Sequence, residues 1–421
     1  MISRKNLFFI YLFYIAFVSL SAFLFAFLFQ EKFHVIDQNY NIIIENLSFE
    51  FGGLIKNLFY TGNYFQIIND IKFYLIKLPA IPFLLLFLFK VSLNFYFIVI
   101  FKNIIIFTLF FFFSYSLLKD FRNKNLFFTI IIIPVIIPYN FLVALNYVYE
   151  DNLIAIFLPL LFLSLISENK KKFIFSSLIL FILYFVKTSM FLLVFIIPFL
   201  IIIFENKVKI FIRTLPLLSS ILAIFLWGYF GYSNTGRFPF GGTGASNNSY
   251  VLASVLNKEF KNYYPNKSVD LIPISKPNNF FKSEWEFYDY YNIQNKNYLK
   301  YNFNSYIEDI CLKLNFIFFG IRVDGVNSDY LESSSNPIRF SSIFSKFFFN
   351  LSIFISLYVL AKNYKNILNC KKEFYFIVIL ILNLTPHIIG WATSKHLVAI
   401  SNVSLIYLIF FIKDKFYADS K

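Results

Sequence analysis

Long apolar runs alternate with short polar segments along most of this chain. A transmembrane helix needs about 20 mostly apolar residues, with about 17 as a practical minimum. By that measure the pattern predicts an all-α polytopic membrane protein with about ten spans, several of them short. The predicted spans cover residues 7–29, 95–118, 126–146, 152–167, 173–187, 189–204, 210–230, 346–361, 374–391 and 397–412.

Two longer segments interrupt this pattern, and both are predicted to lie on the outer side of the membrane. In residues 30–94 the apolar positions recur at helical spacing, broken by Gly52 and Gly53, which indicates helices lying in the membrane interface. The proline-led piece 79–93 is interrupted by Lys90 and reads as a re-entrant or interfacial element. The second segment, about 231–345, begins with FPFGGTGASNNSY. It continues into a stretch from WEFYDYY to NFIFF that predicts one or two amphipathic helices.

Composition supports lipid as the solvent for much of the chain. Of the 421 residues, 58% are hydrophobic and only 14% are charged, and the mean hydropathy is +0.66. A soluble core cannot bury that much apolar surface. We attribute the net charge of +15 to lysines beside the spans, so it does not indicate a nucleic-acid partner.

The basic loops predict the orientation of the chain. SRKN, KDFRNK, ENKKK, ENKVK, KNYKNILNCKK and KDK fall at alternate ends of the predicted spans. The positive-inside rule then places both termini in the cytoplasm. The first apolar run is too long for a signal peptide and lacks a small-x-small cleavage site, so we expect a retained anchor. Cys311 and Cys370 are predicted on opposite sides, which excludes a disulfide between them.

This topology divides the chain into three parts. Residues 1–230 form a transmembrane core that includes the first outer loop, 30–94. Residues 231–345 form an extracytoplasmic segment. Residues 346–421 hold the last helices and a cytoplasmic tail.

Several kinds of soluble-protein site are excluded by the sequence. GGTGAS lacks the lysine and the strand–helix context of a phosphate-binding loop. Only three histidines occur, without metal-ligand spacing, and there is no G-x-S-x-G motif. No cofactor is required by the pattern, and a divalent metal is left open.

Acidic residues occur where apolar runs end on the outer side. Asp37 follows the first span, with Tyr40 three positions later, and could serve as a general base or metal ligand. A solvated loop acid is the alternative. Glu150 and Asp151 occupy a tight outer turn, where catalysis and helix N-capping are both reasonable roles.

Basic residues also lie at the outer ends of spans. Lys187 ends one span in YFVKTSM, and Lys395 and His396 begin the last one in WATSKHLVAI. These side chains could hold a phosphate or could snorkel to the membrane surface. If these acidic and basic side chains line one outer cavity, they would suit a substrate that carries a lipid-linked phosphate.

The order of these motifs resembles the polytopic GT-C glycosyltransferases, in particular the bacterial branch related to protein mannosyltransferases and the lipid A aminoarabinose transferase. The resemblance covers most of residues 1–230 and 340–412. Gln38 stands where family members often carry a second acid, and Lys395 stands where they carry arginine. The matching stretches, in order, are Asp37-x-x-Tyr40, YTGNYF, LPAIPFLLLFLFKVSLN, Lys102-Asn103, YVYEDNLIA, YFVKTSM and KHLVAISNVSLIYLIFF.

The resemblance implies an inverting transferase that uses a polyprenyl-phosphate sugar donor at the outer membrane face. The acceptor would be a lipid, a glycan or a protein. Asp37 would be the base or acceptor-orienting acid, and Glu150 or Asp151 the second acid. Tyr40 would help bind substrate, and the donor phosphate would contact Lys187, Lys395 and His396.

Two other functions are left open by the sequence. An O-antigen polymerase or ligase would depend on outer-loop arginines, for which Arg237, Arg322 and Arg339 are the candidates. A lipid-linked glycan flippase would need charged groups near the midplane of the membrane, whereas Lys102 is the main charge inside a predicted span.

Overall fold

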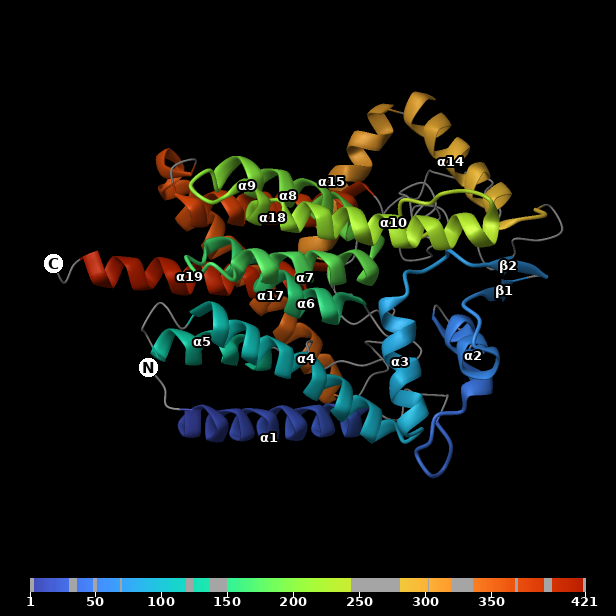
Figure 1. Ribbon diagram of the computed structural model, residues 1–421, viewed down its shortest axis with the longest axis horizontal. Helices are drawn as coiled ribbons and strands as arrows, with labels where there is room; N and C mark the ends of the chain where they lie inside the picture. The colour runs from blue at the N-terminus through green and yellow to red at the C-terminus, as the bar shows by residue number, and fades with distance from the viewer. Residues whose placement is uncertain are drawn as a thin grey trace.

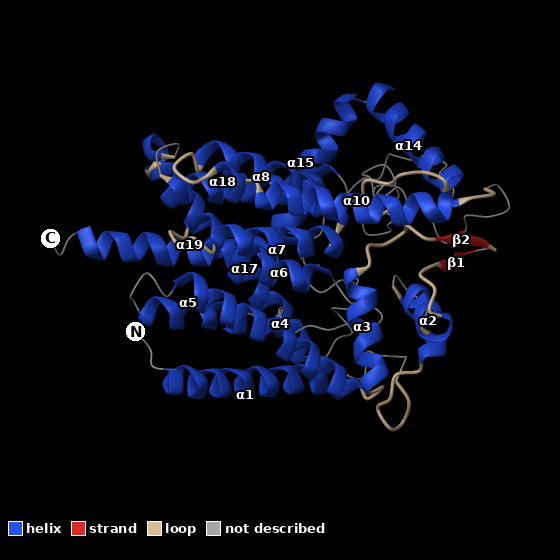
Figure 2. Ribbon diagram, viewed as in Figure 1, coloured by secondary structure: helices blue, strands red, loops and turns tan. Residues whose placement is uncertain are grey.

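Most helices of this chain run along one long axis and pack side by side as a bundle (Figure 1). A computed structural model describes residues 4–29, 36–47, 51–68, 70–118, 124–136, 150–243, 281–301, 303–319, 336–367, 370–389 and 396–418. Helices dominate this part of the chain, and one small β-hairpin lies at one end of the bundle (Figure 2).

Six helices in the described part are long and apolar enough to cross a membrane. They include α1 (Arg4–Phe29), α4 (Phe95–Leu118), α10 (Leu215–Thr235), α17 (Asn336–Lys362), α18 (Lys371–Ile389) and α19 (Leu397–Ala418). Shorter helices complete the bundle: α5 (Lys124–Ile136), α6 (Glu150–Ile166), α7 (Lys172–Val186), α8 (Phe191–Phe204) and α9 (Ile210–Arg213). The prediction of a helical membrane protein is therefore confirmed, while the ten-span count stays a prediction.

The two termini lie at the same end of the bundle (Figure 1). The turns from α6 to α7 and from α8 to α9 lie at this end as well. We call it the inner end, and the opposite end the outer end. Each of these turns carries one of the basic sequences, ENKKK and ENKVK. Which end faces the cytoplasm stays a prediction.

Glu205 links three helices at the inner end. The carboxylate of this residue, directly after α8, lies 2.8 Å from Nζ of Lys172 at the start of α7. It also pairs with Lys371 at the start of α18. One acid thus joins three of the basic sequences, ENKKK, ENKVK and KNYKNILNCKK.

Helix α6 is the centre of the bundle. Each of its residues is buried, and it packs against α4, α7, α18 and α19. A helix that is apolar on all sides is stable only when neighbours surround it, which explains why so short a helix occupies the middle. By contrast, α1 exposes a wide apolar face that includes Phe13 and Phe17, as expected for a helix facing lipid.

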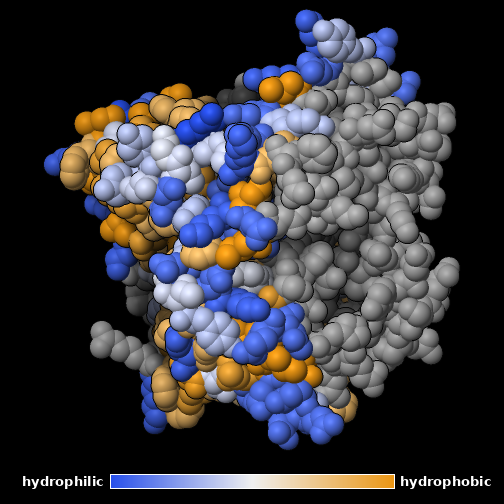
Figure 3. All heavy atoms as spheres, turned by 90° about the vertical axis from the view of Figure 1, so that its right-hand side faces the viewer, coloured by the Kyte–Doolittle hydropathy of each residue, from blue (hydrophilic) through white to orange (hydrophobic). Residues whose placement is uncertain are grey.

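The outer end begins with short elements packed across the bundle. Helices α2 (Gly52–Thr61) and α3 (Ala80–Val91) flank a hairpin of β1 (Gln66–Ile68) and β2 (Ile71–Phe73). In Figure 1, α3 runs nearly perpendicular to the bundle axis, in agreement with an interfacial element. On this end many of the described surface residues are hydrophilic (Figure 3).

Three details differ from the sequence prediction. Gly52 and Gly53 begin α2 and do not break a helix. Both glycines lie where a side chain would not fit. A Cβ on Gly52 would lie 2.7 Å from the Leu47 carbonyl carbon, and one on Gly53 would lie 2.8 Å from the Gln66 side chain. The hairpin was not predicted, because its strands have three residues each. Helix α10 extends past residue 230, and α17 begins well before residue 346, so both reach into the predicted outer segment.

The amphipathic stretch of the second outer segment forms two helices, as one of the predicted alternatives stated. These are α14 (Glu284–Tyr301) and α15 (Phe303–Phe319). They form an inclined pair at the outer end (Figure 1). Helix α14 contacts β2, whereas α15 contacts α18, so the pair bridges the first outer loop and the bundle.

Candidate functional site at the outer end

A buried ion pair joins two of the residues predicted from the sequence. Nζ of Lys187 lies 2.8 Å from Oδ1 of Asp151, and the two side chains are 16% and 4% exposed. Asp151 is in the first turn of α6 and Lys187 directly follows α7. Because these two helices form an antiparallel pair turning at the inner end, their remaining ends meet at the outer end.

The surroundings of this pair favour a carboxylate. The partial positive charge of a helix N-terminus stabilises acids in the first turn, and both Glu150 and Asp151 lie there in α6. Glu150 is also buried. Two acids and one lysine are thus held away from bulk water at the outer end, an arrangement in which charge interactions are stronger than in water.

Asp37 lies in a tight turn of the first outer loop. Its Oδ1 accepts hydrogen bonds from the backbone N–H groups of Asn39 and Asn41, both at 2.8 Å. Its Oδ2 has a longer contact of 3.4 Å with the Asn41 side-chain amide. The Asn41 backbone N–H holds the pKa of Asp37 below its usual value, so this carboxylate is ionised at neutral pH.

Tyr40 closes the same turn in a left-handed backbone conformation, with φ of 60°. Its ring lies 5.3 Å from that of Tyr96, and its carbonyl accepts a 2.8 Å bond from the N–H of Phe95. The turn is thereby attached to the outer start of α4. Asp37 and Tyr40 are part of a built loop, and whether they reach the Asp151–Lys187 pair stays a prediction.

His396 stacks on a histidine that the sequence analysis left without a role. Its ring centroid lies 3.5 Å from that of His387, with 19° between the planes. Both rings are buried. His387 is in the last turn of α18 and His396 immediately precedes α19. Lys395, the predicted partner of His396, lies outside the described residues.

A short segment covers the outer end of α7, beside Lys187. We call residues 237–243 the strap. Tyr184 Oη donates to the Phe240 carbonyl at 2.9 Å, and the Gly242 N–H donates to Thr188 Oγ1 at 3.0 Å. Trp227 Nε1 donates to the Gly241 carbonyl at 3.1 Å. The strap therefore lies against the residue that directly follows Lys187.

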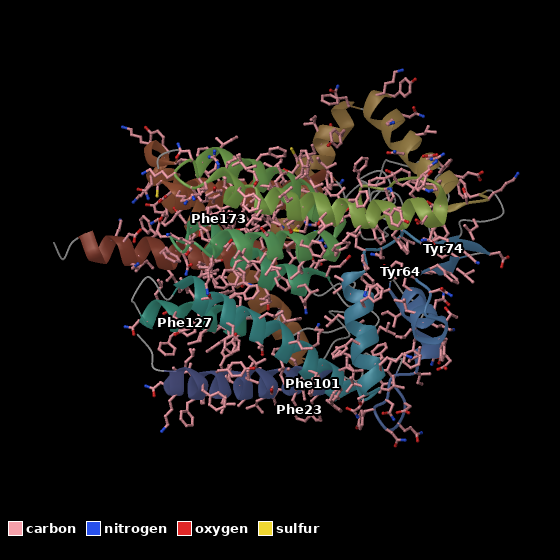
Figure 4. The ribbon with its side chains drawn as sticks, viewed as in Figure 1. Phe23, Tyr64, Tyr74, Phe101, Phe127 and Phe173 are labelled. Carbon is pink, nitrogen blue, oxygen red and sulfur yellow. The ribbon has the colours of Figure 1, made fainter. Side chains whose placement is uncertain are left out.

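Glu284 connects the two outer segments. Its carboxylate accepts the backbone N–H groups of Tyr74 and Leu75 at 2.8 and 2.9 Å, and the Thr243 hydroxyl at 2.5 Å. Burial raises the pKa of Glu284 to about 7. We call these contacts the Glu284 clamp; they hold α14, the strap and the hairpin segment together. Tyr64 and Tyr74 lie at this end of the molecule, whereas Phe127 and Phe173 lie toward the inner end (Figure 4).

Of the three arginines that a polymerase or ligase could use, the structure describes the side-chain contacts of Arg237. Arg237 pairs with Asp289 at 2.7 Å and lies 5.3 Å from the Trp285 ring. Both charged side chains of that pair are exposed. Nothing is described of the Arg339 side chain, and Arg322 lies outside the described ranges.

No group of three or more His, Cys, Asp or Glu residues that could hold a metal ion occurs among the described residues. Glu150 and Asp151 offer two neighbouring carboxylates, so a divalent metal there stays a prediction. The two cysteines, Cys311 and Cys370, are free.

Sequence reasoning missed two features of this end. Glu284 directly precedes the stretch in which amphipathic helices were predicted, and it was given no role. Lys102 was noted as a charge inside a span, but without a role. Comparison with protein-family models, curated proteins and solved structures finds no match to this chain.

Proposed function

We propose that this protein is a membrane glycosyltransferase that moves a sugar from a polyprenyl-phosphate donor to a lipid, glycan or protein acceptor at the outer face of a bacterial inner membrane. The observation that carries the proposal is the buried pair of Asp151 and Lys187. An acid and a cation held together in a partly dehydrated site suit a reaction in which a hydroxyl loses a proton and a phosphate accepts charge.

In the proposed reaction the acceptor oxygen attacks the anomeric carbon of the sugar. The new bond between that oxygen and the carbon forms as the bond from the carbon to the donor phosphate oxygen breaks. Polyprenyl phosphate leaves with the bonding electron pair, and the acceptor proton passes to a carboxylate. The configuration at the anomeric carbon inverts.

Asp37 is our first candidate for the acid that receives or orients the acceptor proton. It is ionised at neutral pH, and its Oδ2 has only a long contact with Asn41. A lone pair on that oxygen is therefore open to a further donor. Glu150 or Asp151 supplies the second acid, and Tyr40 contacts the substrate.

Cations stabilise the leaving phosphate in this scheme. Lys187 has part of its side chain exposed beside the buried acid, and in the sequence Lys395 and His396 directly precede the last helix. Lysine binds phosphate as a point charge, so its position matters more than its orientation. A metal bound by Glu150 and Asp151 would supply further positive charge to the same phosphate.

The proposal is tested with purified protein in liposomes. A panel of undecaprenyl-phosphate sugars labelled in the sugar is supplied together with an envelope extract as acceptor. We expect label to move to an acceptor and undecaprenyl phosphate to be released in equal amount. Chain growth on an acceptor that already carries one unit would favour the polymerase, and movement of intact donor across the bilayer without transfer would favour the flippase. Either result would contradict the proposal that this protein is a single-sugar transferase.

A further inference from the structure

The buried rings of His387 and His396 are in direct contact at the outer end of the bundle. Their centroids lie 3.5 Å apart, with 19° between the planes, and each residue is 4% exposed. The contact joins the last turn of α18 to the residue directly before α19. Two helices are therefore fastened together by two groups that can each take up a proton.

This stack belongs to the regular packing of α18 against α19. Nearer the inner end, the rings of Phe376 and Tyr407 are stacked 4.5 Å apart. His387 follows Phe376 by eleven residues, and His396 precedes Tyr407 by eleven. Eleven residues make about three helical turns, so each histidine lies on the same side of its helix as the aromatic residue. The two histidines thus form the outermost layer of one interface.

The end of α18 depends on contacts with other helices because a proline interrupts it. Pro386 lies inside α18 and has no N–H to donate to the carbonyl of Leu382, four residues earlier. Lys313 of α15 donates its amine to the carbonyl of Ile389, the last residue of α18, at 3.1 Å. Beyond the proline, this lysine and the histidine stack hold the helix end in place.

Several charges surround the two rings. Among the side chains that the structure describes, the charged ones at the outer ends of helices packed against α18 and α19 are Lys313 and Glu308 of α15, Lys346 of α17, Glu150 and Asp151 of α6, and Lys187 before η5 (Thr188–Met190). Glu308 is exposed, and Asp151 is paired with Lys187. Lys313 is fully buried, and its amine contacts the carbonyl two residues after His387. A cation at that position opposes further positive charge on the rings.

Lys346 adds a second cation at the same level. Ser352 of α17 and Ser401 of α19 share a 2.8 Å hydrogen bond. Six residues outward from Ser352 is Lys346, and five residues outward from Ser401 is His396, so the two lie at nearly the same level. The Lys346 amine donates to the carbonyl of Ile317 in α15. Lysines from two helices thus disfavour a second proton on the histidine stack.

We propose that His387 and His396 form a latch between α18 and α19 that acid opens. One proton leaves a cation stacked on a neutral ring, which the contact tolerates. A second proton places two cations 3.5 Å apart at a buried position, where their repulsion is far stronger than in water. Separation of the rings relieves it and frees the outer turn of α18, the helix that also packs against η5. The inference does not depend on the proposed function.

The direction of the pH dependence follows from the number of bound protons. The closed latch holds at most one proton and the open latch holds two, so acid favours the open latch. An unperturbed imidazole takes up a proton near pH ~6.5. Below that pH, uptake of one further proton on opening increases the opening equilibrium by up to about tenfold for each pH unit.

Hydrogen exchange of the full-length protein in lipid nanodiscs tests the latch. The Glu284→Gln background removes the pH dependence expected of the Glu284 clamp. Peptides from the outer turns of α18 and α19 are followed between about pH 7.5 and about pH 5, after correction for the intrinsic pH dependence of exchange. We expect their opening to increase as the pH falls, while peptides from the inner ends of the same helices stay protected.

Histidine variants assign the effect, because the chain has only three histidines. His387→Phe and His396→Phe keep a ring for stacking but remove one of the two protonation sites, so each should stay closed across the range. His34→Gln is the matched control and should respond as the parent does. An unchanged parent across the range would overturn the inference, as would a pH response that survives in both Phe variants.

A second measurement needs no change in the latch itself. In His34→Gln protein with isotope-labelled histidine, NMR observes the imidazole signals of His387 and His396 alone. We expect the second protonation to coincide with increased exchange of the two peptides. Two protons bound by rings that stay in contact would contradict the latch.

Discussion

Asp151 and Lys187 form a 2.8 Å ion pair between the outer ends of two neighbouring helices, α6 and α7. Each residue is eighteen positions from Asn169, in the turn between these helices. A helical hairpin with its turn at Asn169 therefore places both at one level. The pair is the centre of the proposed site.

Breaking this pair should destabilise the protein. Asp151→Asn or Lys187→Met removes the ion pair while one of its two charges stays in place, which costs about 3 kcal/mol for a buried pair. Removing both charges should recover much of the loss, because neither charge of the pair then has to be dehydrated. Apparent melting temperatures of the three variants in detergent test this. A double variant less stable than either single variant would contradict it.

Replacement of Asp37 should affect transfer and leave the fold intact. Asp37→Asn keeps a side-chain oxygen for the backbone N–H groups of Asn39 and Asn41, so the turn should persist. The amide cannot take a proton, and sugar transfer should be lost. Glu45→Gln, in the same outer loop, is the matched control and should retain transfer. Full activity of Asp37→Asn would remove this residue from the mechanism.

Docking of α14 should depend on pH. The pKa of Glu284 is raised from 4.5 to about 7 when it is buried in the Glu284 clamp. Protonation thus favours the docked state, so docking is strongest below pH 4.5 and weakens as the pH rises through about 7. The full change is on the order of 3 kcal/mol. Hydrogen exchange of the α14 peptides across this range measures it, and Glu284→Gln should abolish the pH dependence. Protection of α14 that increases with pH would contradict this account.

The strap depends on a glycine in α10. A Cβ on Gly228 would lie 1.9 Å from the Phe238 ring, so Gly228→Ala should displace the strap from α10. Because the strap contacts Thr188, we expect a cysteine at position 188 to react faster with a maleimide in the Gly228→Ala background. Leu226→Ala, at an exposed position of the same helix, is the control and should leave the reactivity unchanged. Equal reactivity in the Gly228→Ala and parent proteins would count against the strap as a cover.

The two natural cysteines test the orientation of the chain. Cys311 in α15 is exposed, and Cys370 lies beside α18 at the inner end. In intact spheroplasts, a membrane-impermeant maleimide should label Cys311 and leave Cys370 until the membrane is permeabilised. Labelling of Cys370 first would reverse the predicted orientation.

The sequence predicted the positions of most helices because polar segments border their apolar runs, although the ends of α10 and α17 differ from the prediction. Phe95 to Leu118 was predicted residue for residue, since polar segments border it on both sides. The pairing of Asp151 with Lys187 was not predicted. Equal level along a hairpin can be counted from the sequence, but the face on which each side chain lies depends on packing against α4 and α19. The histidine stack and the Glu284 clamp likewise join residues whose approach is decided by tertiary structure.

The most direct test of the transferase is release of undecaprenyl phosphate from a labelled donor by wild-type protein and by Asp151→Asn in liposomes. The account predicts that the wild-type protein transfers the sugar and releases an equal amount of undecaprenyl phosphate. Asp151→Asn should do neither, and a melting transition should show that both proteins are folded. Transfer at the wild-type rate by Asp151→Asn, or no transfer from any donor by the wild type, would contradict it.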